Sequence, residues 1–169
     1  MPPGSGREKA EVDRHLAEIG AQLATAVLSA VPGWVEGSVV QVLEAFEAAG
    51  GTLDRVGGYT EALTRARRAG QQAAAALRGP LQSLLAADVD VQWTTPLALL
   101  RQIVVFPTAV LGDLGVPPLE RDRFAENRFP DDSYGLTPTS LAVLGEEPAQ
   151  LAVVWGAAKA VAHRARHRP

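Results

Sequence analysis

The chain has 169 residues, of which 47% are hydrophobic and 21% charged, and its formal net charge is −3. This length and balance are typical of one globular domain, because a disordered chain would hold fewer apolar residues. The sequence contains no cysteine, which excludes disulfides, thiolate zinc sites, iron–sulfur clusters and a cysteine nucleophile.

The N-terminal segment, residues 1–7, is rich in proline and glycine and leads into the acidic residues Glu8, Glu11 and Asp13. A signal peptide needs a basic start that runs into an apolar stretch, whereas this segment runs into carboxylates. We therefore expect a disordered N-terminus, no export signal and a cytoplasmic protein.

Two amphipathic helices are predicted next. Residues 8–31 repeat apolar side chains at steps of three and four, and residues 35–46 continue the same spacing. Proline and glycine are the residues that most often stop a helix. We expect the pair Pro32 and Gly33 to separate the two helices, and the glycines at 50 and 51 to end the second.

A third helix is predicted over residues 60–77, with Thr60 as its cap. Alanine and glycine form a narrow stripe along it, which favours close approach of a neighbouring helix. Its arginines are interpreted as a solvated face, with Glu61 four residues before Arg65 for a helical ion pair. Gly79 and Pro80 are expected to interrupt the helix.

The most apolar stretch, about 96–111, is expected to be a central buried helix. Thr95 can cap it and Pro96 suits its first position. Pro107 lies inside the stretch and predicts a kink. We do not expect a membrane span, because the run has about fifteen residues where about twenty are needed, and Arg101 interrupts it.

Shorter helices are predicted over 119–127 and 138–144, followed by a last amphipathic helix from residue 148. The fold class is therefore all-α, a bundle of roughly five to seven helices around the segment 96–111. Residues 8–162 are expected to form the domain, and residues 163–169 a basic C-terminal tail.

The sequence lacks the common catalytic and cofactor signatures. It contains no phosphate-binding glycine loop, dinucleotide fingerprint, zinc-protease motif, nucleophile elbow or calcium loop. Their absence leaves enzymatic activity open but gives no reason to name a reaction. No cofactor is predicted.

Two histidines and three arginines mark the end of the chain. His163 and His167 are four residues apart, a spacing that lets two imidazoles share a metal, but no third ligand is near them in sequence. We interpret them as a solvated basic helix end, which the helix dipole favours, and predict no metal. Nucleic-acid binding is not expected, because such proteins usually carry a basic face across the domain.

Arg101 is unusual because a charge within an apolar helix is costly to bury without a partner. It could lie on the solvent side or pair with a carboxylate such as Asp113, Asp131 or Asp132. Alternatively, it could face a groove and hold an anion or an acidic residue of a partner.

The segment 119–136 combines both charge signs with aromatic residues in a chain that is only 5% aromatic. Arginine and aromatic side chains are enriched at interface centres. The same aromatics could instead pin a long connection onto the core. The candidate binding residues are Arg101, Arg121, Arg123, Phe124, Arg128, Phe129, Asp131, Asp132 and Tyr134.

Three functions remain open at this point. The leading hypothesis is a non-enzymatic protein that binds another protein or self-associates through the segment 119–136. The second is an enzyme, or a protein that binds a small molecule or anion, with a pocket near Arg101, Asp131, Asp132 and Tyr134. The third is a nucleic-acid-associated protein that uses the C-terminal tail.

Overall fold

The computed structural model describes residues 4–53, 57–86, 88–90, 103–117 and 141–167. Within these ranges every regular element is a helix, which confirms the all-α class. The elements in chain order are α1 (Gly4–Ala48), α2 (Gly58–Ala86), α4 (Val105–Asp113), the short 3-10 helix η1 (Leu141–Val143) and α6 (Glu146–Arg166).

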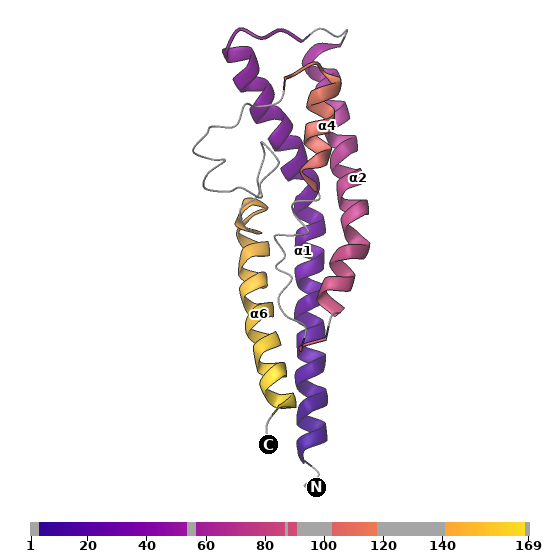
Figure 1. Cartoon of the computed structure of the whole chain (residues 1–169), viewed down its shortest axis with the longest axis vertical. Coiled ribbons are helices and arrows are strands. Elements are labelled where there is room, and N and C mark those ends of the chain that lie inside the picture. The colour runs from indigo at the N-terminus through magenta and orange to yellow at the C-terminus, as the bar shows by residue number, and fades with distance from the viewer. Residues whose placement is uncertain (1–3, 54–56, 87, 91–102, 118–140, 168–169) are drawn as a thin grey trace.

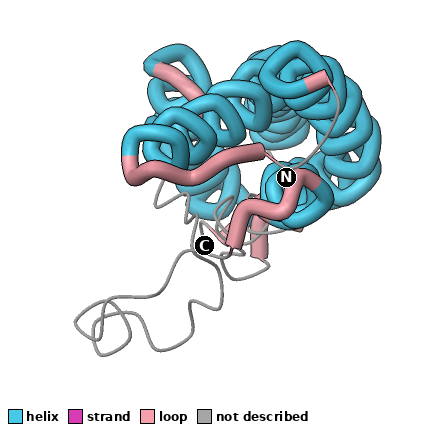
Figure 2. Tube along the Cα trace, turned by 90° about the horizontal axis from the view of Figure 1, so that it is seen from above, coloured by secondary structure: helices cyan, strands magenta, loops and turns pink. Residues whose placement is uncertain are grey.

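The helices are long and nearly antiparallel (Figure 1). α1 has 45 residues and runs the length of the molecule, and α2 returns beside it. α6 packs along the N-terminal half of α1, whereas α4 packs on α1 and α2 near the opposite end. Seen along the bundle, the helices surround a shared interior, and the two chain ends lie close together (Figures 1 and 2).

α1 continues through Pro32 and Gly33, so the prediction that this pair ends the first helix is wrong. Proline inside a helix costs about 3 kcal/mol, partly because its nitrogen cannot donate to the carbonyl four residues earlier. Val31 and Val35, on either side, have no exposed surface. Burying such side chains contributes about 1.5–3 kcal/mol each, which offsets the cost of the proline. The two halves of α1 are not collinear in Figure 1, as expected for a helix bent at proline.

α2 also continues through the glycine and proline that were expected to interrupt it. It begins at Gly58, two residues before the predicted cap Thr60, and extends beyond Pro80 to Ala86. Leu77 and Leu81 flank the proline and are almost fully buried, so the core spans the interruption. Of the predicted stripe, Ala66, Gly70, Ala73 and Leu77 are buried, whereas Leu63 and Ala74 are partly exposed; Ala62 and Ala69 complete the buried face.

α4 covers part of the segment that was expected to be central. Of residues 96–111, the structure describes 103–111, which pack on α1 and α2. Pro107 lies in the first turn of α4, where backbone N–H groups have no partner within the helix. The proline therefore costs no hydrogen bond within α4, and a turn at Val104 separates α4 from the helical residue Ile103, so the helical run is interrupted close to the predicted kink.

α1 is also the one described helix that is long and apolar enough to cross a membrane, judged by length and composition alone. About a third of its most apolar window, 33%, is buried inside the protein. The core helix of a bundle passes the same test, and α1 contributes the largest part of this core, with Leu23, Val27 and Leu43 each at most 1% exposed.

Candidate functional site

The nine binding residues proposed from the sequence all lie outside the described residues. They are Arg101, Arg121, Arg123, Phe124, Arg128, Phe129, Asp131, Asp132 and Tyr134. Asp113, one of the suggested partners of Arg101, is described and is exposed at the end of α4. The described part of the chain instead brings together two other features, a polar cluster and an apolar trough.

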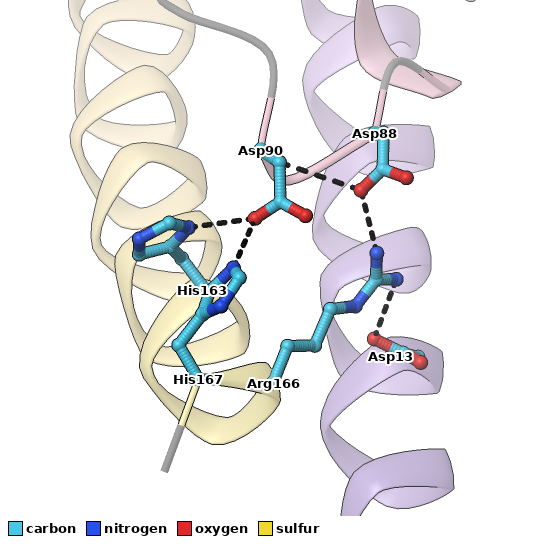
Figure 3. A network of polar contacts seen from close by, with 6 residues as sticks. All are labelled: Asp13, Asp88, Asp90, His163, Arg166 and His167. Atoms are coloured by element: carbon cyan, nitrogen blue, oxygen red, sulfur yellow. Dashed lines mark hydrogen bonds and ion pairs between the residues drawn. The ribbon is translucent and has the colours of Figure 1, made fainter. Parts of the chain in front are cut away.

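The first feature lies where the N-terminal part of α1 runs beside the C-terminal end of α6, and we call it the terminal polar cluster. Three segments distant in sequence supply it: α1, the loop after α2 and the last turns of α6 (Figure 3). Positions 163 and 166 fall on one face of α6, because helical residues three apart are neighbours, and His167 directly follows the last turn of the helix. The cluster consists of Asp13, Asp88, Asp90, His163, Arg166 and His167.

The two histidines converge on one carboxylate oxygen. His163 Nδ1 lies 2.9 Å from Asp90 Oδ1, and His167 Nε2 lies 2.7 Å from the same oxygen. The imidazole rings are 4.6 Å apart between centroids and tilted by 49°. Each ring nitrogen can donate to Asp90 when it carries the proton, so the three side chains form a single hydrogen-bonded group.

Arg166 holds the loop that presents Asp90. Its Nη1 donates to Asp88 Oδ1, and its Nη2 donates to Asp13 Oδ1 at 3.4 Å. Asp88 Oδ1 also accepts the backbone N–H of Asp90 at 3.3 Å, which fixes the turn between the two aspartates. One guanidinium therefore links α6, α1 and the loop after α2.

The histidines also change the acidity of Asp90. The hydrogen bond from His167 is the largest influence and lowers the pKa of the Asp90 carboxyl below its usual 3.8. Partial desolvation opposes this effect, and the hydrogen bond from His163 adds to it. Asp90 is therefore a carboxylate at neutral pH, able to accept from both rings.

The sequence analysis did not identify Asp90 as a partner of the histidines, because it lies 73 residues before His163. The histidine spacing was visible, but the third group becomes a neighbour only when α2 returns along α1. Residues 163–166, expected in the basic tail, belong to α6, and Arg166 is in ion pairs with two aspartates. In retrospect, the alternation of Asp88 and Asp90 directly after α2 was the available signal.

The second feature is an apolar trough between α1 and α6, which we call the α1–α6 trough. It has a volume of about 490 Å³ and includes Val12 and Ile19 from α1 and Val154 and Val161 from α6. Its charged rim consists of Glu11, Arg14, His15 and Glu18. A more polar hollow of about 770 Å³ extends it along the same two helices, and Val154 lines both.

The arginines of α2 lie far from the C-terminal end. Arg65 pairs with Glu61 at 2.8 Å, as predicted, and Arg67 pairs with Glu36 of α1 at 3.0 Å. The start of α2, which carries them, is at the opposite end of the molecule from the C-terminus (Figure 1). These residues and the terminal polar cluster therefore do not form one basic surface.

No protein-family model, curated protein or solved structure matches this chain.

Proposed function

We propose that the chain is a non-enzymatic helical protein that self-associates, and that two copies pack together through the α1–α6 trough. The observation that carries this proposal is the exposure of valines along one face of α6. Val154 and Val161 are 47% and 44% exposed and border the trough. Burying apolar surface of this kind in a second subunit is favourable by about 25 cal/mol per Å².

The spacing of the apolar residues suits helix packing. Val154 and Val161 are seven residues apart on α6, and half-buried Val12 of α1 lines the same trough, whose floor includes Ile19 at 5% exposed. A seven-residue repeat keeps side chains on one face of a helix, where they can insert between those of a facing helix. Two antiparallel helices with such faces form half of a four-helix bundle, which a second copy would complete.

The charges around the trough fit a second copy of the same chain. Both signs are present on the rim, since Arg14 lies between Glu11 and Glu18 along one stretch of α1. In a twofold dimer each subunit presents the same patch to the other, so acidic and basic groups can pair across the interface. A strongly basic partner helix would fit this mixed rim less well.

The exposed side of α1 supports an aqueous environment for this surface. Between residues 22 and 44, every exposed position of α1 is a polar residue or a glycine. The polar residues include Gln22, Thr25, Ser29 and Gln41. A membrane-spanning helix would place large apolar side chains there. We therefore propose that α1 is the core helix of a soluble, cytoplasmic bundle.

Two further expectations from the sequence remain proposals in addition to self-association through the trough. They are the count of five to seven helices around residues 96–111, and a protein contact through the segment 119–136. A pocket near Arg101 and nucleic-acid contact by the tail remain alternatives. The engagement of Arg166 by two aspartates makes the nucleic-acid alternative the weaker of these two.

The test is light scattering of the untagged chain over a concentration series. We expect the wild-type mass to approach that of a dimer, and Val154→Glu to remain monomeric with unchanged helical content. Val105→Glu is the matched control, because Val105 is 51% exposed on α4, away from the trough. A wild-type chain that is monomeric throughout, or a Val105→Glu variant that dissociates as fully as Val154→Glu, would contradict the proposal.

A further inference from the structure

We propose that Asp90, His163 and His167 form a binding site for a divalent transition-metal ion of the zinc type. This inference rests on the terminal polar cluster and does not depend on self-association. Each residue offers one ligand atom, and the three atoms lie within 4.8 Å of one another. They come from two elements that the fold holds side by side, the end of α6 and the loop after α2 (Figure 3).

The donor set matches this class of metal. Neutral imidazole nitrogens and a carboxylate oxygen are common zinc ligands, and three protein ligands leave a fourth position for water. Two histidines four residues apart at a helix are a frequent way to supply two of the ligands, and here His163 lies in the last turn of α6 and His167 directly follows it. The set contains two nitrogens and only one carboxylate, so it favours zinc-type ions over calcium or magnesium, which prefer oxygen ligands.

The distances require side-chain movements of two kinds: the two oxygen–nitrogen separations must lengthen, and the two histidine nitrogens, which lie within 4.8 Å of each other, must come to about 3.4 Å. Ligand atoms about 2.1 Å from a tetrahedral zinc ion are separated from each other by about 3.4 Å. In the structure, Asp90 Oδ1 lies 2.9 and 2.7 Å from the two histidine nitrogens. An ion entering between them would lengthen these two separations by roughly half an ångström. The side chains of all three residues are about half exposed, so they can adjust and an ion can reach them.

Proton positions also allow coordination. Each neutral imidazole carries one proton, which can reside on either ring nitrogen. When an ion replaces the hydrogen bonds to Asp90, His163 Nδ1 and His167 Nε2 become the coordinating nitrogens and the proton of each ring moves to its other nitrogen. The rings stay neutral, and the carboxylate supplies the negative charge.

The residues around the three ligands favour a cation and hold the loop in place. The cluster holds three carboxylates, those of Asp13, Asp88 and Asp90, and one guanidinium, that of Arg166, which pairs with Asp13 and Asp88, so it has an excess of negative charge. The contacts of Asp88 with Arg166 and with the Asp90 backbone orient the ligand-bearing loop. Outer-shell contacts of this kind commonly set the affinity of a metal site.

A bound ion would tie the loop after α2 to the last turn of α6. Because the three ligands meet only in the folded chain, binding stabilises the folded state in proportion to the logarithm of the free metal concentration. The melting temperature should therefore rise when Zn²⁺ is added and return when a chelator removes it.

The test uses the full, untagged chain, titrated with Zn²⁺ by calorimetry and with Co²⁺ by visible absorption. We expect one ion per chain, d–d bands typical of a nitrogen and oxygen donor set, and a rise in melting temperature. His167→Gln and Asp90→Asn should each weaken binding at least about tenfold, as loss of a ligand or outer-shell partner does. The third histidine of the chain supplies the control, because His15→Gln removes an imidazole outside the cluster and should leave binding unchanged.

A second measurement uses only the wild-type protein, because a variant that misfolds would lose metal binding for an unrelated reason. Zn²⁺ should shift the imidazole NMR signals of His163 and His167 at one equivalent, while those of His15 stay in place. The proposal is overturned if Zn²⁺ binds with no defined stoichiometry, if His15 responds as strongly as the other two, or if Asp90→Asn binds as tightly as the wild type.

Discussion

The backbone of Pro32 in α1 lies directly against Gly70 in α2. A Cβ atom added to Gly70 would be 2.8 Å from the Pro32 carbonyl oxygen and 2.9 Å from its Cα. Real Cβ atoms essentially never approach other atoms so closely, so only glycine fits without a backbone shift. The contact between α1 and α2 at this point therefore depends on a glycine at position 70, opposite Pro32.

Gly70→Ala is expected to destabilise the protein by about 1–3 kcal/mol, because the added methyl group must displace the backbone of α1. The effect opposes the helix propensity of alanine, which alone would stabilise by about 1 kcal/mol. Denaturant unfolding measures the difference. Gly37→Ala is the control, since Gly37 is in α1 with nothing within 4 Å of an added Cβ, and it should gain stability. Equal stability changes in the two variants would show that α1 and α2 separate easily.

Arg166→Gln is expected to lower stability by up to about 1 kcal/mol. The side chain of Arg166 is 27% exposed, and it joins Asp88 and Asp13, which are themselves partly exposed, so solvent screens both ion pairs. Unfolding at low and at high salt should show a smaller loss at high salt. Arg14→Gln provides the comparison, because Arg14 is 71% exposed and 3.9 Å from Glu18. A loss in Arg14→Gln as large as in Arg166→Gln would argue against an anchoring role for Arg166.

The acidity of Asp90 tests the hydrogen bonds that the histidines make. In metal-free buffer, NMR titration should give a pKa for Asp90 below 3.8, and His167→Gln should raise it, because the His167 hydrogen bond is the main cause of the lowering. A carboxyl whose pKa is lower in the folded chain stabilises the fold above its unfolded pKa, and this contribution disappears as pH falls through the folded pKa. An Asp90 pKa that is the same in both proteins would show that the contact does not persist in solution.

The helical class and one face of each long helix could be predicted from the sequence, because burial at steps of three and four follows from helix geometry. The Glu61 and Arg65 ion pair was predictable for the same reason. The prediction that helices end at Pro32 and Pro80 was wrong, because local helix propensity takes no account of the burial of residues beyond each proline. Asp90 was missed as a neighbour of His163 because their contact depends on the path of α2, which periodicity does not specify.

Pro80 offers a direct test of how burial overrides local propensity. It lies inside α2, where its missing N–H leaves the carbonyl of Ala76 without its helical donor, yet the helix continues to Ala86. Pro80 is exposed, so replacing it removes little packed apolar surface. Pro80→Ala should therefore restore the helical hydrogen bond and raise stability by about 1–3 kcal/mol, measured as a higher denaturant midpoint. A loss of stability would contradict this prediction. It would indicate that the ring of Pro80 helps to orient the end of α2 and the loop that carries Asp90.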